Sequence, residues 1–248
     1  MTSIRNRIPD ILTGHMLAAA PTGGGKSHGI GKLVEELHET NRPFVILDTK
    51  MINHVGLAIG LNKTLSEKSP KRVKIFRVFP DTELDTEDYM RMLDQIPYLL
   101  IIPVKGTPLT NLVRENLKVM TACQRLEQPR HIIIEEAHHY LKSPQNPMEE
   151  MAWIFREGRT YRIWGWALTQ RIQSFPKDVW ANCYWSYLMR FHIPQDISYC
   201  AALIPNFGDI NEDLNHHDIL LYDMLRRKKP PYEIIRANEI KRKTQHLG

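Results

Sequence analysis

Hydrophobic residues along the chain fall into short continuous runs, each about the length of one strand. Six of these runs predict strands, at 15–20, 43–48, 72–78, 98–104, 131–135 and 164–169. Between them the spacing of apolar residues predicts helices over 26–39, 86–95, 110–126 and 146–159. Continuous apolar strands that alternate with helices are typical of a parallel sheet covered on both faces. We therefore predict an α/β fold with a mostly parallel sheet.

The last third of the chain has a different pattern. Three more strand-like runs, at 182–191, 217–223 and 232–237, follow one another with less helix between them. They predict an antiparallel C-terminal extension of the sheet. Segments 64–71 and 142–147 have the composition of loops. We expect one domain over 1–248, with a core at about 14–190 and a strand-rich extension with a basic tail at about 191–248.

Composition narrows the class of protein. Hydrophobic residues make up 42% of the chain and charged residues 25%, which is usual for a soluble globular protein. No apolar run approaches the ~18 residues of a membrane span, and the N-terminus lacks the pattern of a secretory signal. The three cysteines, Cys123, Cys183 and Cys200, are expected to be reduced core residues. These features predict a cytoplasmic protein without a membrane span of its own.

The net charge of +5 is unevenly distributed. Basic residues concentrate at 226–229 and 241–243. Such clusters are either a solvated tail or a contact to a polyanion such as nucleic acid, and the sequence leaves both interpretations open.

A glycine-rich segment follows the first predicted strand. Residues Ala20 to Ser27 read APTGGGKS and match the P-loop pattern G-x-x-x-x-G-K-[ST], except that alanine replaces the first glycine. Lys26 is expected to reach the β- and γ-phosphates of a nucleotide, and Ser27 to ligate Mg²⁺. The plainer alternative is a glycine-rich turn before an ordinary helix, but the lysine and serine favour a nucleotide site. The predicted nucleotide-binding residues are Thr22, Gly23, Gly24, Gly25, Lys26, Ser27 and His28.

Two carboxylates end the strand predicted at 131–135. Ligands of open α/β sheets bind at strand tips, so Glu135 and Glu136 are expected beside the P-loop. Glu135 would hold the Mg²⁺ shell through water, and Glu136 would deprotonate the attacking water. This pair favours an ATPase over a kinase. The alternative is a helix N-terminus enriched in acidic residues. We assign His138 and His139 to structure and not to a metal site with His131.

Four segments together resemble one superfamily. GHMLAAAPTGGGKS, FVILDTK, IIIEEAHHYL and REGRTYRIWGWALTQR are similar to motifs of the HerA–FtsK superfamily of DNA-pumping ATPases. The resemblance covers residues 14–190 and implies a RecA-like P-loop NTPase core. It places Asp48 at the end of the strand after the P-loop helix. Arg162 and Ile163 lengthen the GRTYRIWG part of the fourth segment relative to the family pattern.

The resemblance also implies roles for residues outside the two motifs. Gln170 would be a polar sensor of the γ-phosphate or the attacking water. Arg159 would be an arginine finger supplied to the ATP of the neighbouring subunit in a homo-hexameric ring. The alternatives for the finger are Arg156, Arg171 and Arg190, and Lys142 is a candidate for a DNA-facing loop.

We expect the chain to lack the extra domains of cellular HerA and FtsK, so the resemblance implies a minimal motor core. Such cores resemble the genome-packaging ATPases of membrane-containing icosahedral viruses. We expect an ATP-hydrolysing translocase of double-stranded DNA that docks on a capsid or membrane protein and binds DNA without sequence preference. The alternatives are a cellular or plasmid DNA motor, a secretion or phage-assembly ATPase, a small-molecule kinase, or a scaffold with a relic nucleotide site.

Overall fold

The computed structural model describes residues 8–227 and 229–245. Residues 1–7, residue 228 of the first basic cluster, and residues 246–248 lie outside the described part, and with them the corresponding parts of the predictions above.

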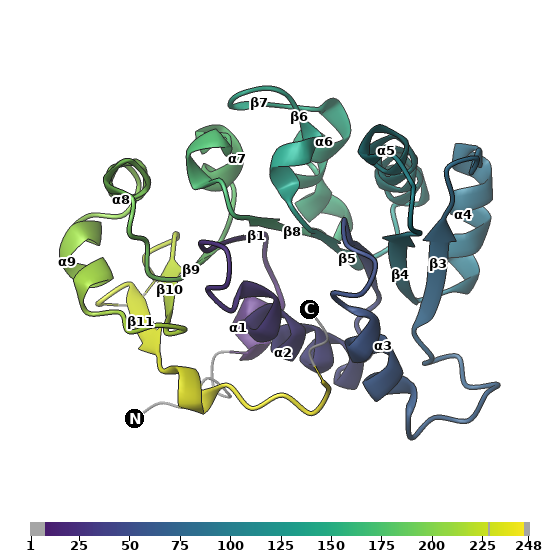
Figure 1. The fold of residues 1–248 in the computed structure, drawn as a ribbon, viewed down its shortest axis with the longest axis horizontal. Helices are drawn as coiled ribbons and strands as arrows, with labels where there is room; N and C mark the ends of the chain where they lie inside the picture. Colours follow the sequence, from purple (N-terminus) through teal and green to yellow (C-terminus); the bar gives the residue numbers. More distant parts are fainter. Residues whose placement is uncertain (1–7, 228, 246–248) are drawn as a thin grey trace.

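Nine strands of the described chain form one sheet (Figure 1). From one edge to the other, their order is β3 (Lys74–Val78), β4 (Tyr98–Pro103), β2 (Phe44–Leu47), β5 (Arg130–Ile134), β8 (Ile163–Thr169), β1 (Met16–Ala19), β9 (Trp185–Leu188), β10 (Ile219–Asp223) and β11 (Tyr232–Ile235). Each of these nine strands overlaps a strand predicted from the hydrophobic runs.

Strand direction divides the sheet into two parts. From β3 to β9 every neighbouring pair is parallel, whereas β10 pairs antiparallel with β9 and with β11. The α/β fold and its antiparallel C-terminal extension are therefore confirmed. The extension is smaller than the three late runs suggested, because β9 still runs parallel to β1.

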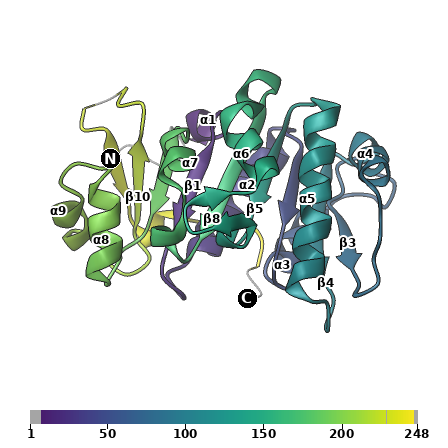
Figure 2. The same cartoon turned by 90° about the horizontal axis from the view of Figure 1, so that it is seen from above.

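Helices cover both faces of the sheet, as predicted. Figure 1 shows the layers separated, and Figure 2 looks down on the molecule from the side of α5 to α8. One face carries α4 (Thr86–Gln95), α5 (Leu109–Leu126), α6 (Glu149–Arg156), α7 (Lys177–Ala181), α8 (Pro194–Ala201) and α9 (Phe207–Glu212). The other face carries α1 (Ile8–Ile11), α2 (Lys26–Glu39), α3 (Val55–Asn62) and the C-terminal segment.

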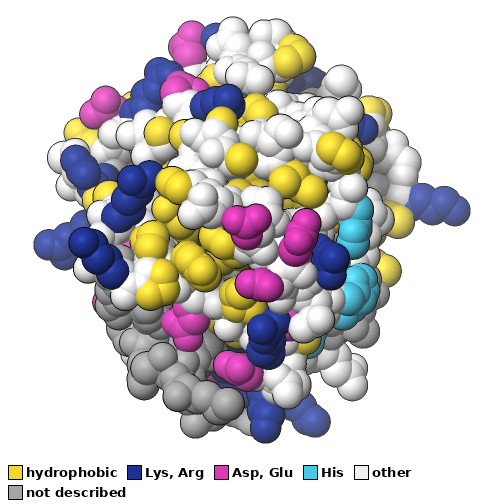
Figure 3. Space-filling model, turned by 90° about the vertical axis from the view of Figure 1, so that its left-hand side faces the viewer, with side chains coloured by type: hydrophobic (Ala, Val, Ile, Leu, Met, Phe, Trp, Pro, Cys, Tyr) yellow, Lys and Arg dark blue, Asp and Glu magenta, His cyan; other side chains and the backbone are white. Residues whose placement is uncertain are grey.

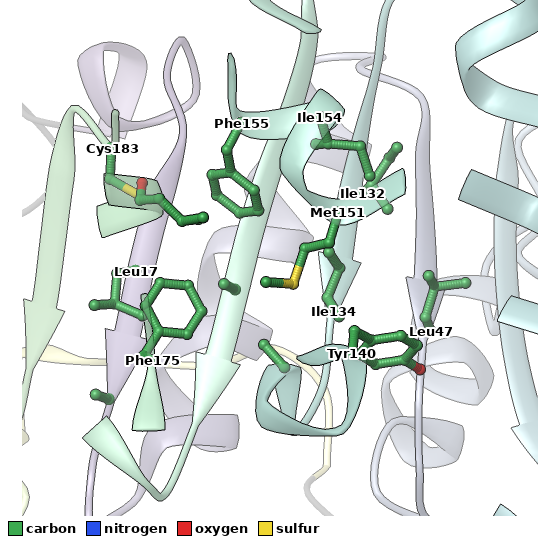
Figure 4. Close-up of a cluster of buried hydrophobic side chains, with 14 of the residues drawn as sticks. Leu17, Leu47, Ile132, Ile134, Tyr140, Met151, Ile154, Phe155, Phe175 and Cys183 are labelled. Atoms are coloured by element: carbon green, nitrogen blue, oxygen red, sulfur yellow. The ribbon is translucent and has the colours of Figure 1, made fainter. Parts of the chain in front are cut away.

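The alternation of side chains along the strands builds two cores. In β1, Leu17 and Ala19 face the cluster under α4 to α9, while Met16 and Ala18 face the cluster under α1 to α3. Figure 4 shows part of the first cluster, in which side chains of the sheet meet those of α6 and of the segments near it. Because the central strands are buried on both faces, they read in the sequence as continuous apolar runs.

Short helices are where the sequence interpretation was incomplete. The pattern did not predict α1, α3, α7, α8 or α9. The segment predicted as a loop at 142–147 contains the small hairpin of β6 (Leu141–Ser143) and β7 (Asn146–Pro147). These elements are short, so too few apolar positions repeat to give a helical period. By contrast, the helices predicted at 26–39 and 86–95 match α2 and α4, the latter held by a capping box between Asp85 and Asp88.

The end of the sheet at β10 and β11 carries α8 and α9 over one face. Figure 3 shows this side of the molecule, where hydrophobic side chains gather between acidic and basic ones.

The three cysteines are free thiols and buried, as predicted.

Candidate nucleotide site

Parallel strands bring the predicted site residues to one edge of the sheet. The P-loop follows β1, Glu135 and Glu136 follow β5, and Gln170 follows β8. Because β8 lies between β1 and β5, Gln170 lies between the P-loop and the two glutamates. The carboxyl edge of a parallel sheet is the usual place for a ligand.

Glycine conformations shape the P-loop. Gly23 has φ 78° and Gly25 has φ 92°, in the left-handed region that an L-residue adopts only with strain. Gly24 donates its amide to Pro21 O at 3.0 Å. Ala20 is not among the described residues with positive φ, so an alanine is tolerated in place of the first glycine of the pattern. Gly25 is the N-cap of α2, which directs the first amides of that helix into the loop.

Lys26 and Glu135 form a buried ion pair. Lys26 Nζ lies 3.1 Å from Glu135 Oε2, and the two side chains are 6% and 2% exposed. Burial alone would raise the pKa of Glu135, but Lys26 and His54 outweigh it and hold the pKa of this carboxyl well below its usual range. Glu135 is therefore an anion, as a metal-binding carboxylate must be.

Asn53 connects Ser27 to Glu135. Its Nδ2 donates to Ser27 Oγ at 3.2 Å and to Glu135 Oε1 at 3.3 Å. A hydroxyl and a carboxylate held this close are hard oxygen ligands of the kind that Mg²⁺ prefers, so the residues present fit the metal that the P-loop implies. The sequence analysis did not predict Asn53 as a site residue, although its loop follows β2 at the carboxyl edge of the sheet.

His54 is a second residue that the sequence analysis missed. Its Nε2 lies 2.7 Å from Glu135 Oε1, and its backbone amide donates to Asp48 Oδ2 at 3.2 Å. Burial opposes protonation of His54, yet the hydrogen bond to Glu135 and the nearby Asp48 raise its pKa. Burial raises the pKa of Asp48 to about 6. Asp48, which the resemblance singled out, thus holds the loop that orients Glu135.

Glu136 is held in a strained backbone conformation. Its φ of 47° and ψ of 53° are left-handed, which for a residue other than glycine is a feature of functional sites. Gln170 Nε2 donates to Glu136 Oε1, and Thr22 Oγ1 donates to Gln170 Oε1 at 2.5 Å. Glu136 Oε2 is buried and has no hydrogen-bond donor among the described residues. The nearest described cation-forming group is His138 Nδ1, at 3.4 Å.

A cavity of about 600 Å³ adjoins this network. The sequence predicted half of its lining, from Thr22 to His28 together with Gln170. The rest comes from segments far apart in the sequence: Pro21, Lys50, Asn53, Met189, His217, Ala237 and Ile240. The volume suits a nucleotide-sized ligand.

Solved structures resemble the fold of this chain, although no protein-family model matches the sequence and no curated protein matches it. The genome-packaging NTPase B204 from Sulfolobus turreted icosahedral virus 2, in complex with AMP, aligns at a TM-score of 0.63 and 14% identity over 91% of this chain and 98% of that chain. The chain has the fold of the viral genome-packaging NTPases.

Two other structures agree with this assignment. B204, the DNA-packaging ATPase from Sulfolobus turreted icosahedral virus, aligns at a TM-score of 0.62 and 14% identity over 90% of this chain and 97% of that chain. VirB4 of Thermoanaerobacter pseudethanolicus aligns at 0.53 and 10% identity, over 85% and 86%. The fold implied by the HerA–FtsK resemblance is thus confirmed. At these identities the likeness concerns the fold, and the chemistry rests on the site.

Arg159 lies far from its own P-loop. It is exposed in the short helix η3 (Gly158–Tyr161), which precedes β8 at the amino edge of the sheet, and it donates to Tyr184 OH at 3.2 Å. Among the alternatives, Arg156 pairs with Asp178 at 2.5 Å and Arg190 donates to Leu214 O at 2.8 Å. Only a second subunit could bring Arg159 to a nucleotide, so its role stays a prediction.

The histidines that suggested a metal site are separated. His131 belongs to β5 and bonds Leu12 O at 2.9 Å, while the rings of His138 and His139 lie 4.2 Å apart beyond the other end of that strand. Burial lowers the pKa of His138 to about 4, so this ring is neutral beside Glu136.

None of the helices in the described ranges is long and apolar enough to cross a membrane.

Proposed function

We propose that this chain is an ATPase that hydrolyses ATP with Mg²⁺ and drives the movement of double-stranded DNA. The observation that carries the ATPase assignment is a pair of contacts beside the P-loop cavity. Lys26 and Gln170 line the cavity, Lys26 pairs with Glu135, and Gln170 donates to Glu136. Four groups of these types in one place are what phosphoanhydride hydrolysis requires.

Binding uses the P-loop. The amides at the N-terminus of α2 and the ammonium of Lys26 receive the β- and γ-phosphates, with Thr22 to His28 around them. Ser27 and Glu135, the latter through water, would hold Mg²⁺, and the metal would supply positive charge that offsets the charge developing on the phosphates. Asn53 and His54 keep Glu135 in place for this task.

Glu136 is the base. Gln170 fixes one of its carboxylate oxygens, and the other, Oε2, keeps acceptor capacity that the described residues do not use. A water on the γ-phosphate gives its proton to Oε2 as its oxygen bonds to phosphorus and the bond to the β-phosphate oxygen breaks. The products are ADP and phosphate, and a positioned base contributes about 10² to 10⁴ in rate.

The motor assignment goes beyond the site. It is supported by the fold shared with the genome-packaging NTPases and by an exposed Arg159 that only a neighbouring subunit's ATP can use. We infer a homo-hexameric ring around double-stranded DNA, in the cytoplasm of a host cell, docked on a capsid or membrane protein. Mixing Arg159→Ala with Lys26→Ala subunits tests the ring, because rings that combine an intact site with an intact finger regain hydrolysis.

A cellular or plasmid DNA motor, or a secretion or phage-assembly ATPase, is the second candidate, favoured by the fold shared with VirB4. The first experiment separates the two. ATP hydrolysis is measured with and without long double-stranded DNA over a salt titration, because contacts to phosphates weaken as salt rises. A DNA motor gives a severalfold, salt-sensitive stimulation. Hydrolysis that ignores DNA at every salt concentration favours the second candidate, and no hydrolysis at all contradicts the assignment of the glutamate pair.

A further inference from the structure

The nucleotide cavity has two chemically different ends. Strand β8 lies on one side of β1 and brings Gln170, whereas β9 lies on the other side and is followed by Met189. The Gln170 end holds the charged network, so a triphosphate on the P-loop directs its nucleoside toward Met189. His217, Ala237 and Ile240 line the cavity with Met189, and three of these four residues come from the last 32 residues of the chain.

Asp218 fixes the start of the C-terminal segment. This carboxylate is 3% exposed, and it pairs with Arg236 Nη1 at 2.5 Å and accepts the amide of Ala237 at 3.0 Å. It also accepts the amide of Asn215 at 3.0 Å, which ties the loop before β10 to the same point. In that loop, His217 Nδ1 lies 2.9 Å from the carbonyl oxygen of Gly24. The P-loop and the C-terminal segment are therefore joined through this loop.

Glu35 fixes the far end of the segment. It belongs to α2, the P-loop helix, and is fully buried. Its carboxylate accepts the amides of Lys243 at 3.0 Å and Thr244 at 2.8 Å, and the hydroxyl of Thr244 at 2.7 Å. A buried carboxylate that receives backbone amides is a specific anchor, because leaving it without these donors would be costly.

Arg242 strengthens the same anchor. Its side chain is 3% exposed, and Nε lies 3.7 Å from Glu35 Oε1. The guanidinium packs on Gly31 so closely that a Cβ at Gly31 would lie 2.5 Å from Arg242 Cζ. The second basic cluster is thus not a free tail, since Arg242 is buried and Lys243 pairs with Glu39 at 2.5 Å. Figure 1 shows the C-terminal segment crossing the face of the molecule that carries α2.

We propose that residues 237–244, here called the C-terminal strap, form the nucleoside wall of the nucleotide site. Ile240 lies between the two anchors, is 9% exposed and faces the cavity, where Met189 is 2% exposed. The flat ring of a purine packs against this apolar wall while the phosphates rest on the P-loop. The inference rests on the proposed function, because it needs a nucleoside triphosphate on the P-loop.

Two ligands distinguish binding at the wall from binding at the P-loop. Inorganic tripolyphosphate fits the phosphate half alone, whereas ATP needs both halves. Isothermal titration calorimetry is run with each ligand and Mg²⁺ on the full chain, on Ile240→Asp and on the matched control Ile193→Asp. Ile193 is 53% exposed and does not line the cavity, so the control makes the same substitution away from the proposed wall. We expect Ile240→Asp to weaken ATP binding at least tenfold and to leave tripolyphosphate binding and the control within twofold.

Hydrogen exchange of the unmodified chain keeps the test independent of variant folding. ATP should slow exchange of the strap amides, and tripolyphosphate should not. Equal protection of the strap amides by both ligands contradicts the proposed wall. An equal loss of affinity for both ligands in Ile240→Asp also contradicts it. ATP binding unaffected by Ile240→Asp overturns the wall and leaves the ATPase assignment intact. An unmodified chain that binds neither ligand overturns the proposed function, and the inference with it.

Discussion

The two ends of the nucleotide cavity are built by different means. At the Gln170 end, each functional side chain follows a buried parallel strand, and the strand order alone brings them together. At the Ile240 end, the wall comes from the C-terminal strap, which two buried carboxylates, Asp218 and Glu35, hold against the P-loop helix. The first end holds the charged groups, and the second holds apolar surface. Changes at the first end should therefore alter turnover, whereas changes at the second should alter affinity.

The largest effect is expected from Glu136→Gln. The amide keeps the shape of the side chain and removes the base, so kcat should fall about 10³-fold while ATP affinity stays within about threefold. Single-turnover hydrolysis and calorimetry measure the two quantities. The matched control is Glu149→Gln, an exposed carboxylate that pairs with Lys142. A variant that loses ATP binding as well as turnover would contradict the division between the two ends.

Gln170→Ala should have the next largest effect. Without its amide, Glu136 Oε1 loses its donor and the carboxylate is free to rotate, so kcat should fall about 10- to 100-fold. The KM for ATP should change little. Gln195→Ala, on the exposed face of α8, serves as the control. If KM rises and kcat does not change, Gln170 acts in ATP binding. The division between a turnover end and an affinity end of the cavity would then not hold at this residue.

Asn53→Ala probes the link between Ser27 and Glu135. Loss of the amide that holds both oxygens should raise the Mg²⁺ concentration for half-maximal hydrolysis about tenfold. ATP affinity measured in the presence of a chelator is the internal control and should be unchanged. An effect on the chelator-treated protein would mean that Asn53 shapes the P-loop itself.

The smallest effect on the nucleotide site is expected from substitutions at the amino edge of the sheet, where His15 and His131 are buried. These substitutions should instead change how stability depends on pH. Burial lowers their pKa values to about 4 and about 3, and His15 Nδ1 accepts the amide of Gly165 at 2.9 Å. Unfolding lets both rings bind protons, so acid favours the unfolded state. Above about pH 6.5 both rings are neutral in either state and do not lower the free energy of unfolding. Below it, stability declines by about 1.4 kcal/mol per pH unit for each ring until its folded pKa is reached.

The test is the free energy of unfolding from pH 7 to pH 5. His15→Asn keeps an acceptor for Gly165 and should flatten the slope, whereas His192→Asn, at an exposed position, should not. An unchanged slope in His15→Asn would assign the acid sensitivity to other groups. ATP affinity of folded protein at pH 7 should be the same in both variants.

The difference between the two ends also explains what could be predicted from sequence. The P-loop and the Glu135–Glu136 pair lie next to runs such as HIIIE, where a local pattern carries both the strand and the chemistry. Asn53 and His54 lie in an irregular loop, and only their position after β2 could have indicated them. Ile240 and Glu35 are 205 positions apart in the sequence and give no local signal. Their proximity follows from the path of the chain around the last strands.

The ion pair between Lys26 and Glu135 has a consequence for how the site fills. The lysine that must meet a phosphate already has an anionic partner at 3.1 Å, deep in the protein. An incoming polyanion therefore competes with a resident carboxylate for the lysine. A phosphate chain that arrives without a divalent cation leaves Glu135 with His54 as its one remaining ion-pair partner among the described residues, whereas a bound divalent cation would replace the charge that Lys26 withdraws.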